Sequence, residues 1–235
     1  MYAIAKKGLH PIVKQYILQP CINSIAFDEQ LQAYVYSRGK RGGLTKALKR
    51  LYYPRYSRKR KTQVRASKRR RKASSIAQGQ QIDYELQLYV ATGKYPDDEM
   101  AKAVCYYLEQ HMEHHIQAVQ LPLLVMVNKK ERITQADVIT MDMKGQLWMW
   151  EIKSGWNQAQ SQGYLQHLRY PKVLSKDHEH WELQRHYTQE GLRHCGLPIH
   201  RSHVLNVYFQ DDQVAVERRP AANWCKQIKV GAVRL

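Results

Sequence analysis

The stretch 133–140, ITQADVIT, and the stretch 146–153, QLWMWEIK, decide the fold of this chain. Both are rich in Ile, Val and Trp, the residue types that favour β-strands. Between them lies MDMKG, residues 141–145, a short polar connection that ends in glycine and is typical of a β-hairpin. The pattern therefore predicts two neighbouring antiparallel strands in the interior of a sheet.

Three charged residues stand toward the ends of these strands. Glu151 and Lys153 are two apart, so they project from the same face, and pairing of the strands can bring Asp137 beside them. Two carboxylates and one ammonium can hold Mg²⁺ and position a water for attack on phosphate. On an exposed strand the same residues would be a solvated pair worth under about 1 kcal/mol. The apolar context favours the catalytic interpretation, because a buried acid is costly without a partner.

The order Asp137, then Glu151-x-Lys153, resembles the PD-(D/E)xK nuclease superfamily, which has the restriction-endonuclease-like fold. Two further motifs are similar to its RecB-type and lambda-exonuclease-type branch. Residues 79–86, GQQIDYEL, match the N-terminal helix motif, with an Asp where that branch has His. Gln166 and Tyr170 match the Gln-x-x-x-Tyr helix that follows the Lys. The resemblance covers about residues 74–170, with a tail to about residue 218.

The resemblance implies an α/β fold with a restriction-endonuclease-like core: a mixed central β-sheet flanked by helices, here with a basic N-terminal extension. It implies a Mg²⁺-dependent deoxyribonuclease, exo- or endonucleolytic, in which Mn²⁺ could substitute for Mg²⁺. Asp137, Glu151 and the backbone carbonyl of Ile152 would coordinate the metal, and Lys153 would orient the attacking water. Gln166 and Tyr170 would contact the DNA backbone.

A third metal carboxylate is expected from a helix that begins near Ser74 and runs through Tyr89. Asp83 and Glu85 lie about 160° apart on such a helix, at 100° per residue, so both cannot easily serve one metal. Glu85 lies nearer the apolar face that packs toward the sheet. The sequence therefore favours Glu85 as the third ligand and leaves Asp83 in reserve.

The net charge of +18 comes almost entirely from one segment. Residues 30–82 contain 17 Lys and Arg and no acid, whereas the rest of the chain has 21 basic and 20 acidic residues. Because like charges repel and large aliphatic residues are few, residues 40–73 are expected to be a flexible segment that binds nucleic-acid phosphates. Residues 1–39 are expected to be a lead-in with helical pieces, and residues 74–235 the nuclease domain.

The basic side chains expected to contact nucleic acid form two runs. They are Arg58, Lys59, Arg60 and Lys61, followed by Lys68, Arg69, Arg70, Arg71 and Lys72. Such spaced runs also resemble a bipartite nuclear-localisation signal, which would direct the protein to the nucleus of a eukaryotic cell or of a virus's eukaryotic host. In any other cell the expected location is the cytoplasm. A mitochondrial presequence is the lesser alternative, since the first 28 residues contain no Arg.

Cysteine spacing and hydropathy narrow the class of protein. The four cysteines are scattered without a C-x-x-C pair, which predicts free thiols and no iron–sulfur cluster. The sequence contains no run of about 18 apolar residues, so no membrane span is predicted.

DNA is the expected partner and RNA the alternative. A competing interpretation is a non-catalytic nucleic-acid-binding or packaging protein on an inactive nuclease fold. A third is a basic structural protein without nuclease ancestry, in which the three motif matches would be accidental.

Overall fold

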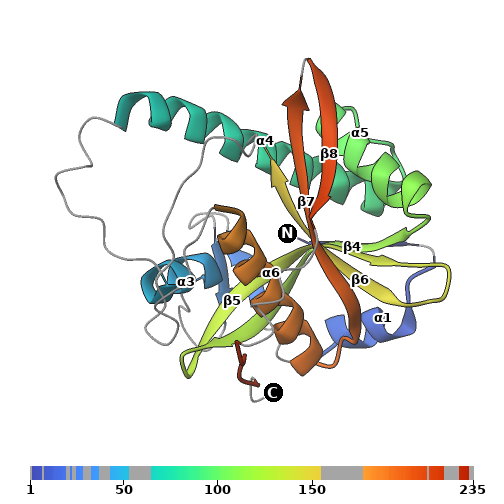
Figure 1. Cartoon of the computed structure of the whole chain (residues 1–235). Helices are drawn as coiled ribbons and strands as arrows, with labels where there is room; N and C mark the ends of the chain where they lie inside the picture. Colours follow the sequence, from blue (N-terminus) through green and yellow to red (C-terminus); the bar gives the residue numbers. More distant parts are fainter. Residues whose placement is uncertain are drawn as a thin grey trace.

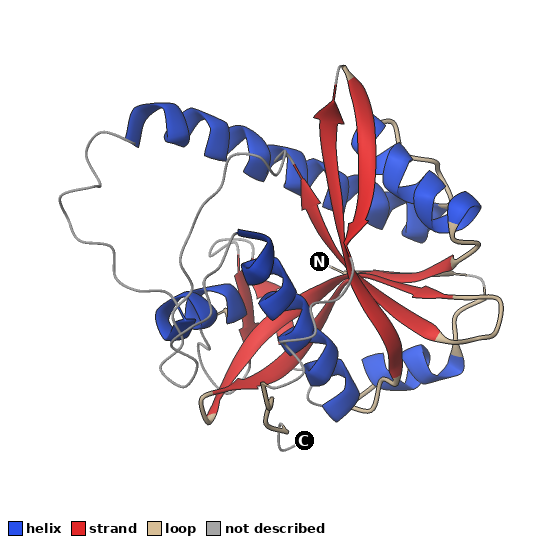
Figure 2. Cartoon of the chain, viewed as in Figure 1, coloured by secondary structure: helices blue, strands red, loops and turns tan. Residues whose placement is uncertain are grey.

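The computed structural model describes residues 2–6, 8–19, 22, 25–28, 33–36, 43–52, 65–154, 177–210, 212–219 and 228–232. Their arrangement is drawn in Figure 1 and, by element type, in Figure 2. In chain order the elements are β1 (Ala3–Ile4), α1 (Pro11–Ile17), β2 (Ile25–Asp28), β3 (Ala33–Tyr36), α3 (Leu44–Tyr52), α4 (Arg65–Thr92), α5 (Glu99–Tyr106), the π-helix η2 (Tyr107–His111), β4 (His115–Val127), β5 (Lys130–Met141), β6 (Leu147–Ser154), α6 (Asp177–His194), β7 (Ile199–Gln210) and β8 (Gln213–Arg219).

A six-stranded mixed sheet forms the centre of the molecule, in the order β1-β4-β5-β6-β7-β8. Its neighbours are antiparallel except for β6 and β7, which are parallel. Parallel neighbours need a crossover connection, and α6 lies in the chain between these two strands. Strands β2 and β3 pair separately as a two-stranded sheet. The expected α/β architecture, a mixed sheet flanked by helices, is confirmed.

The predicted hairpin is also confirmed, since β5 and β6 are antiparallel neighbours with Val138 opposite Trp150. Its turn is held by Asp142, whose Oδ1 accepts the backbone N–H groups of Lys144 and Gln146, each at 2.9 Å. Gly145 has φ of +75°, a left-handed conformation that favours glycine. The polar connection thus fixes the register of the strands that carry the three charged residues.

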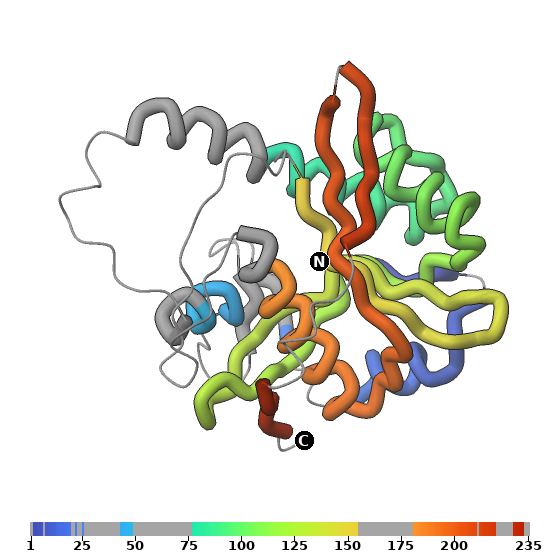
Figure 3. Tube along the Cα trace, in the orientation of Figure 1, coloured from blue at the N-terminus to red at the C-terminus, as the bar shows by residue number. Residues whose placement is uncertain are grey.

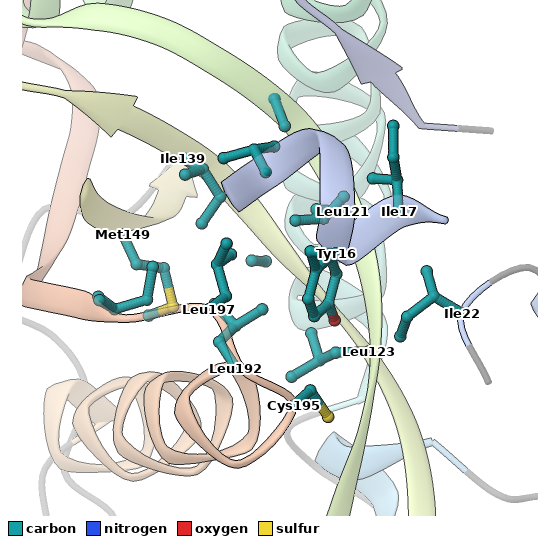
Figure 4. Packing of buried hydrophobic residues seen from close by; sticks show 14 of the residues in the cluster. Tyr16, Ile17, Ile22, Leu121, Leu123, Ile139, Met149, Leu192, Cys195 and Leu197 are labelled. Atoms are coloured by element: carbon teal, nitrogen blue, oxygen red, sulfur yellow. The ribbon is translucent and has the colours of Figure 1, made fainter. Parts of the chain in front are cut away.

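Helices cover both faces of the sheet (Figure 1). On one face α4 and α5 pack against Val138 and Trp150. On the other face α1 and the end of α6 pack around Tyr16, with Ile139 and Met149 from the hairpin (Figure 4). Alternate residues of β5 and β6 therefore enter two different cores, as the period of a strand requires.

Pro122 lies inside β4, where a proline would normally interrupt the ladder. It pairs with Gln135 of β5, but β1 is only two residues long and pairs with Ala118 and Val119. The Pro122 carbonyl instead accepts the Tyr16 hydroxyl of α1 at 3.1 Å. A short edge strand and a helix thus make the proline tolerable.

The structure does not follow the segment boundaries that were expected from the sequence composition. The N-terminal β1 joins the main sheet, and residues 44–52 of the basic segment form α3, whose Leu44 and Leu48 are buried against β4 and α6. The expectation that all of residues 40–73 form a flexible arm is therefore wrong for α3. Helix α4 begins at Arg65, nine residues before the expected start at Ser74 (Figure 1). Figure 3 traces the path of the Cα atoms in the same view. Among the described residues, none of the helices combines the length and apolarity needed to cross a bilayer.

Candidate functional site

A cavity of about 510 Å³ lies where β5 and β6 part, and we call it the acidic cavity. It is bounded by α3, α4 and α6 as well as by the two strands. Its charged lining residues are Lys46, Asp83, Asp137, Glu151 and Lys153. The three charged residues of the predicted hairpin site therefore share one cavity, as expected from their strand positions.

Asp137 occupies the gap between the two strands. The β5–β6 ladder ends at Val138 and Trp150, one residue before Asp137 and Glu151 would face each other. In the gap, Asp137 Oδ2 accepts the backbone N–H of Ile152 at 2.8 Å. The N–H and C=O of one strand residue point to the same side, so the Ile152 carbonyl also faces this gap.

Glu151 and Lys153 project from the same face of β6 and form an ion pair. Lys153 Nζ donates to Glu151 Oε1 at 2.5 Å, and the Glu151 side chain is fully buried. The other carboxylate oxygen, Oε2, has no hydrogen-bond partner among the described residues. A buried carboxylate oxygen without a donor is energetically costly, which makes this atom a natural ligand for a cation.

Asp83 reaches the same cavity from α4 because that helix passes close to the end of β6. A Cβ at Gly79, one turn earlier, would lie 3.3 Å from Ser154 Oγ. Glycine therefore permits the close approach that brings Asp83 near Asp137 and Glu151, whose charges both act on its pKa.

Glu85 lies elsewhere, so the preference for it over Asp83 is wrong. Its Oε2 accepts the backbone N–H of Asp97 at 3.1 Å, and its Oε1 accepts from Gln81 at 3.0 Å. These bonds fix the Glu85 carboxylate at the connection between α4 and α5 instead of in the acidic cavity. The structure thus places the reserve candidate, Asp83, beside the two sheet acids.

Gln120 belongs to this site and was not anticipated. It lies in β4 between Val119 and Leu121, which pair with Val138 and Ala136 of β5, and its Nε2 donates to Asp137 Oδ1 at 3.3 Å. Its φ of +56° is unusual for a residue other than glycine, so the strand is locally strained at this position. A signal was available, because Gln120 is a polar residue within the apolar run AVQLPLLV.

The electrostatics of the acidic cavity show an excess of negative charge. Burial raises the pKa of Asp137 above its ordinary value, while the ammonium of Lys153 opposes the shift. Burial and the Asp137 charge raise the pKa of Glu151 to about 7, and the same two causes raise the pKa of Asp83 well above its usual range. Burial alone would lower the pKa of Lys153, but the carboxylates of Glu151 and Asp137 raise it, so Lys153 is protonated.

The donor set fits a divalent cation. The three carboxylates and the two lysines that line the cavity carry a net charge of −1 when all are ionised, and carboxylate and carbonyl oxygens are the ligands that Mg²⁺ prefers. In the described part of the chain, however, no three His, Cys, Asp or Glu side chains are already arranged around one metal position. Because Lys153 occupies Glu151 Oε1, a cation would reach this carboxylate through Oε2.

Most residues expected to contact nucleic acid either lie outside the described residues or have side chains that are not described. Gln166, Tyr170 and the run Arg58, Lys59, Arg60 and Lys61 lie outside the described residues. Lys68, Arg69, Arg70, Arg71 and Lys72 belong to α4 by their backbone, and their side chains are not described.

Three comparisons with known proteins were negative. The chain matched no protein-family model, no curated protein and no solved structure. The fold and the site thus define an α/β protein with a six-stranded mixed sheet and an acidic cavity beside β5 and β6.

Proposed function

We propose that this protein is a Mg²⁺-dependent nuclease that hydrolyses DNA phosphodiester bonds, on a restriction-endonuclease-like core of the PD-(D/E)xK type. The observation that carries the proposal is the convergence of Asp83, Asp137, Glu151 and Lys153 in one cavity. An excess of buried carboxylates needs a cation, and a phosphodiester needs both a cation and a water to be hydrolysed.

Asp137, Glu151 and Asp83 would hold the metal, together with the backbone carbonyl of Ile152. When bound, Mg²⁺ would lower the pKa of a coordinated water and polarise the phosphate. Lys153 is protonated and lines the cavity, so it can donate to a phosphate oxygen and stabilise the negative charge that develops there.

Two backbone and amide contacts keep the ligands in position. The N–H of Ile152 holds one oxygen of Asp137, and Gln120 holds the other. Burial of the cluster lowers the local dielectric, which strengthens every charge interaction made with the phosphate. Manganese would substitute for magnesium because both take oxygen ligands.

The basic residues around positions 58–72 would hold the nucleic-acid backbone without reading its sequence. Each Lys or Arg that meets a phosphate releases a counterion, so the affinity would fall steeply with salt. RNA carries the same phosphates and is the second substrate to assay.

The experiment pairs binding with cleavage on the same preparations. The full chain is incubated with linear, circular and single-stranded DNA in Mg²⁺ and in EDTA, as wild type, Asp137→Ala and Lys153→Ala. Lys153→Ala should keep DNA affinity, since it removes one of 38 basic residues. It should lose about 3 kcal/mol of transition-state stabilisation, over a hundredfold in rate. Asp137→Ala should lose at least as much.

Lys144→Ala is the matched control, because Lys144 is an exposed cation in the hairpin turn, outside the acidic cavity. It should cleave like wild type, and circular dichroism should show all variants folded. Equal cleavage by wild type and both cavity variants would mean a contaminant or another site, and the proposal would fall.

One observation favours a second candidate function, a nucleic-acid-binding protein on an inactive nuclease fold. The Lys153 ammonium already neutralises one oxygen of Glu151, as it would in a site that no longer takes a metal. This candidate predicts strong, salt-dependent DNA binding in every variant and no Mg²⁺-dependent cleavage in any of them.

A further inference from the structure

A second cavity, of about 640 Å³, lies on the other side of α6, and its charge is opposite. It is formed by α6, the first residues of β7 and residues 228–230. We call it the cationic cavity, because four of its lining residues are Lys or Arg and one is acidic: Arg185, Arg193, Arg201, Lys229 and Glu190. Gln184 lines the acidic cavity and its neighbour Arg185 lines this one, so α6 separates the two.

Two of the four cationic side chains already form hydrogen bonds and ion pairs with neighbouring residues. Arg185 is buried and donates to Glu182 at 2.8 Å, and also to Gln189 and Ser202. Arg193 donates to the Ile199 carbonyl at 2.7 Å and pairs with Glu190. Glu190, the one acid among the lining residues, is therefore already neutralised.

The other two cations are exposed. No carboxylate pairs with Arg201 or Lys229 within the described part of the chain. The Arg201 guanidinium lies over the ring of Trp148, 5.3 Å from its centroid, which restrains it without removing its hydrogen-bond donors. Both residues line the cationic cavity, and neither has a carboxylate partner among the described residues.

His203 reports the resulting potential. Burial, first, and the nearby charges of Arg218, Arg185 and Arg201 together lower the pKa of its imidazole to about 4, against one backbone hydrogen bond that raises it. The ring is therefore neutral at pH 7, and the surroundings disfavour one more positive charge. Burial disfavours a charge of either sign, but the guanidinium charges create a positive potential that favours an anion.

We infer that the cationic cavity binds a phosphate group, held by Arg201 and Lys229. A phosphate carries up to two negative charges, which matches the two uncommitted cations, whereas a single carboxylate would leave one of them unbalanced. The guanidinium supplies a planar pair of donors suited to two phosphate oxygens, and the lysine supplies a compact point charge. This site goes beyond the proposed nuclease activity and does not depend on it.

Lysine labelling read by mass spectrometry tests the site residue by residue, so binding by the basic segment does not obscure it. The full chain is labelled with an amine-reactive acetylating reagent in EDTA, with inorganic phosphate or with a short single-stranded oligonucleotide. Lys229 should react about fivefold more slowly when ligand is present, because a salt-bridged amine is a poor nucleophile. Lys130 and Lys144, both exposed and outside either cavity, are the internal controls.

Arg201→Ala should raise the ligand concentration needed for half-protection of Lys229 by about tenfold, as expected for the loss of one charged hydrogen bond. Lys130→Ala removes the same charge elsewhere and should leave that concentration within about twofold. Protection by the oligonucleotide alone would identify a strand phosphate as the ligand. Protection by the oligonucleotide and by inorganic phosphate would identify a free phosphate group.

Two results would overturn the inference: Lys229 reacting at one rate with and without either ligand, or protection that Lys144 shares in full. Because the labelling is done in EDTA, DNA cleavage plays no part in the readout. A failed nuclease assay and a failed labelling experiment are therefore distinguishable.

Discussion

The acidic cavity and the cationic cavity lie on opposite sides of one helix, and their charges are arranged differently. In the first, three carboxylates outnumber the two lysines, and burial raises the pKa values of the acids. In the second, Arg185 and Arg193 are paired with acids, and only Arg201 and Lys229 remain without one among the described residues. A buried charge that is already paired supports the fold, whereas a surplus of one sign marks the place where a ligand of the other sign can bind.

The largest effect is expected at Arg185, which lines the cationic cavity. Arg185→Met should cost about 3–5 kcal/mol of unfolding free energy, because it removes the guanidinium that pairs with buried Glu182. Arg193→Met is the control on the same helix. Its ion pair with Glu190 is partly exposed, so about 1 kcal/mol is expected.

Urea unfolding of the two variants gives the comparison. Equal losses would show that Arg185 is not a special part of the scaffold. The assignment of the uncommitted charge to Arg201 and Lys229 would then need revision.

A pH titration tests whether ionisation of Glu151 in the acidic cavity lowers the stability of the protein when no metal is bound. The pKa of Glu151 is raised to about 7 from 4.5, so its ionisation opposes folding. Its favourable contribution is complete below pH 4.5 and is lost as the pH rises through 7. Relative to Glu151→Gln, the wild type in EDTA should lose up to about 3 kcal/mol of stability between pH 4.5 and pH 8.

The measurement is urea unfolding of both proteins at several pH values in EDTA. A stability difference that stays constant with pH would mean that Glu151 ionises normally. Adding Mg²⁺ should stabilise the wild type more at pH 8 than at pH 5, because a cation binds the ionised carboxylates.

The contrast between Asp83 and Glu85 gives the next prediction. Asp83→Asn should weaken Mg²⁺ binding about tenfold, a loss of about 1.4 kcal/mol, and shrink the rise in melting temperature that Mg²⁺ causes. Glu85→Gln should keep that rise. It should cost about 1 kcal/mol of stability, since a neutral amide accepts the Asp97 N–H less strongly.

Calorimetric titration with Mg²⁺ and thermal melts separate the two effects. If Glu85→Gln abolished the metal response and Asp83→Asn did not, the original preference from the sequence would be restored.

The hairpin could be predicted because its information is local. Alternation in residues 133–140 and 146–153 fixes which side chains share a face, and the glycine turn fixes the register. Asp137, Glu151 and Lys153 were therefore found from spacing alone.

The choice of Asp83 over Glu85 could not be made from the sequence, because it depends on how α4 crosses the sheet. The apolar face through Ile82 and Leu86 does pack on the sheet core. The acidic cavity, however, lies beside that face at the end of β6, where Gly79 allows close approach and Asp83 points inward. Glu85 is engaged by Asp97, a contact between α4 and the chain leading into α5 that helical periodicity does not contain.

The smallest effect is expected at Lys46, and it is best judged against the basic residues at positions 68–72. The basic segment is expected to bind nucleic-acid phosphates, and its contribution can be tested by removing charge. Deleting residues 40–72 would damage the core, since Leu44 and Leu48 are buried. Neutralising Lys68, Arg69, Arg70, Arg71 and Lys72 should weaken DNA binding and flatten its salt dependence, while the rate at saturating DNA persists.

Lys46 differs from those residues, because it belongs to α3 and lines the acidic cavity. Lys46→Ala should reduce the slope of log affinity against log salt by about one charge and weaken binding only a few-fold. The exposed Lys130→Ala should change neither quantity. Filter binding at several salt concentrations gives the slope, and cleavage at saturating DNA gives the rate. If Lys46→Ala lowered that rate as far as Lys153→Ala, α3 would belong to the catalytic machinery, and the separation between holding the strand and cleaving it would be lost.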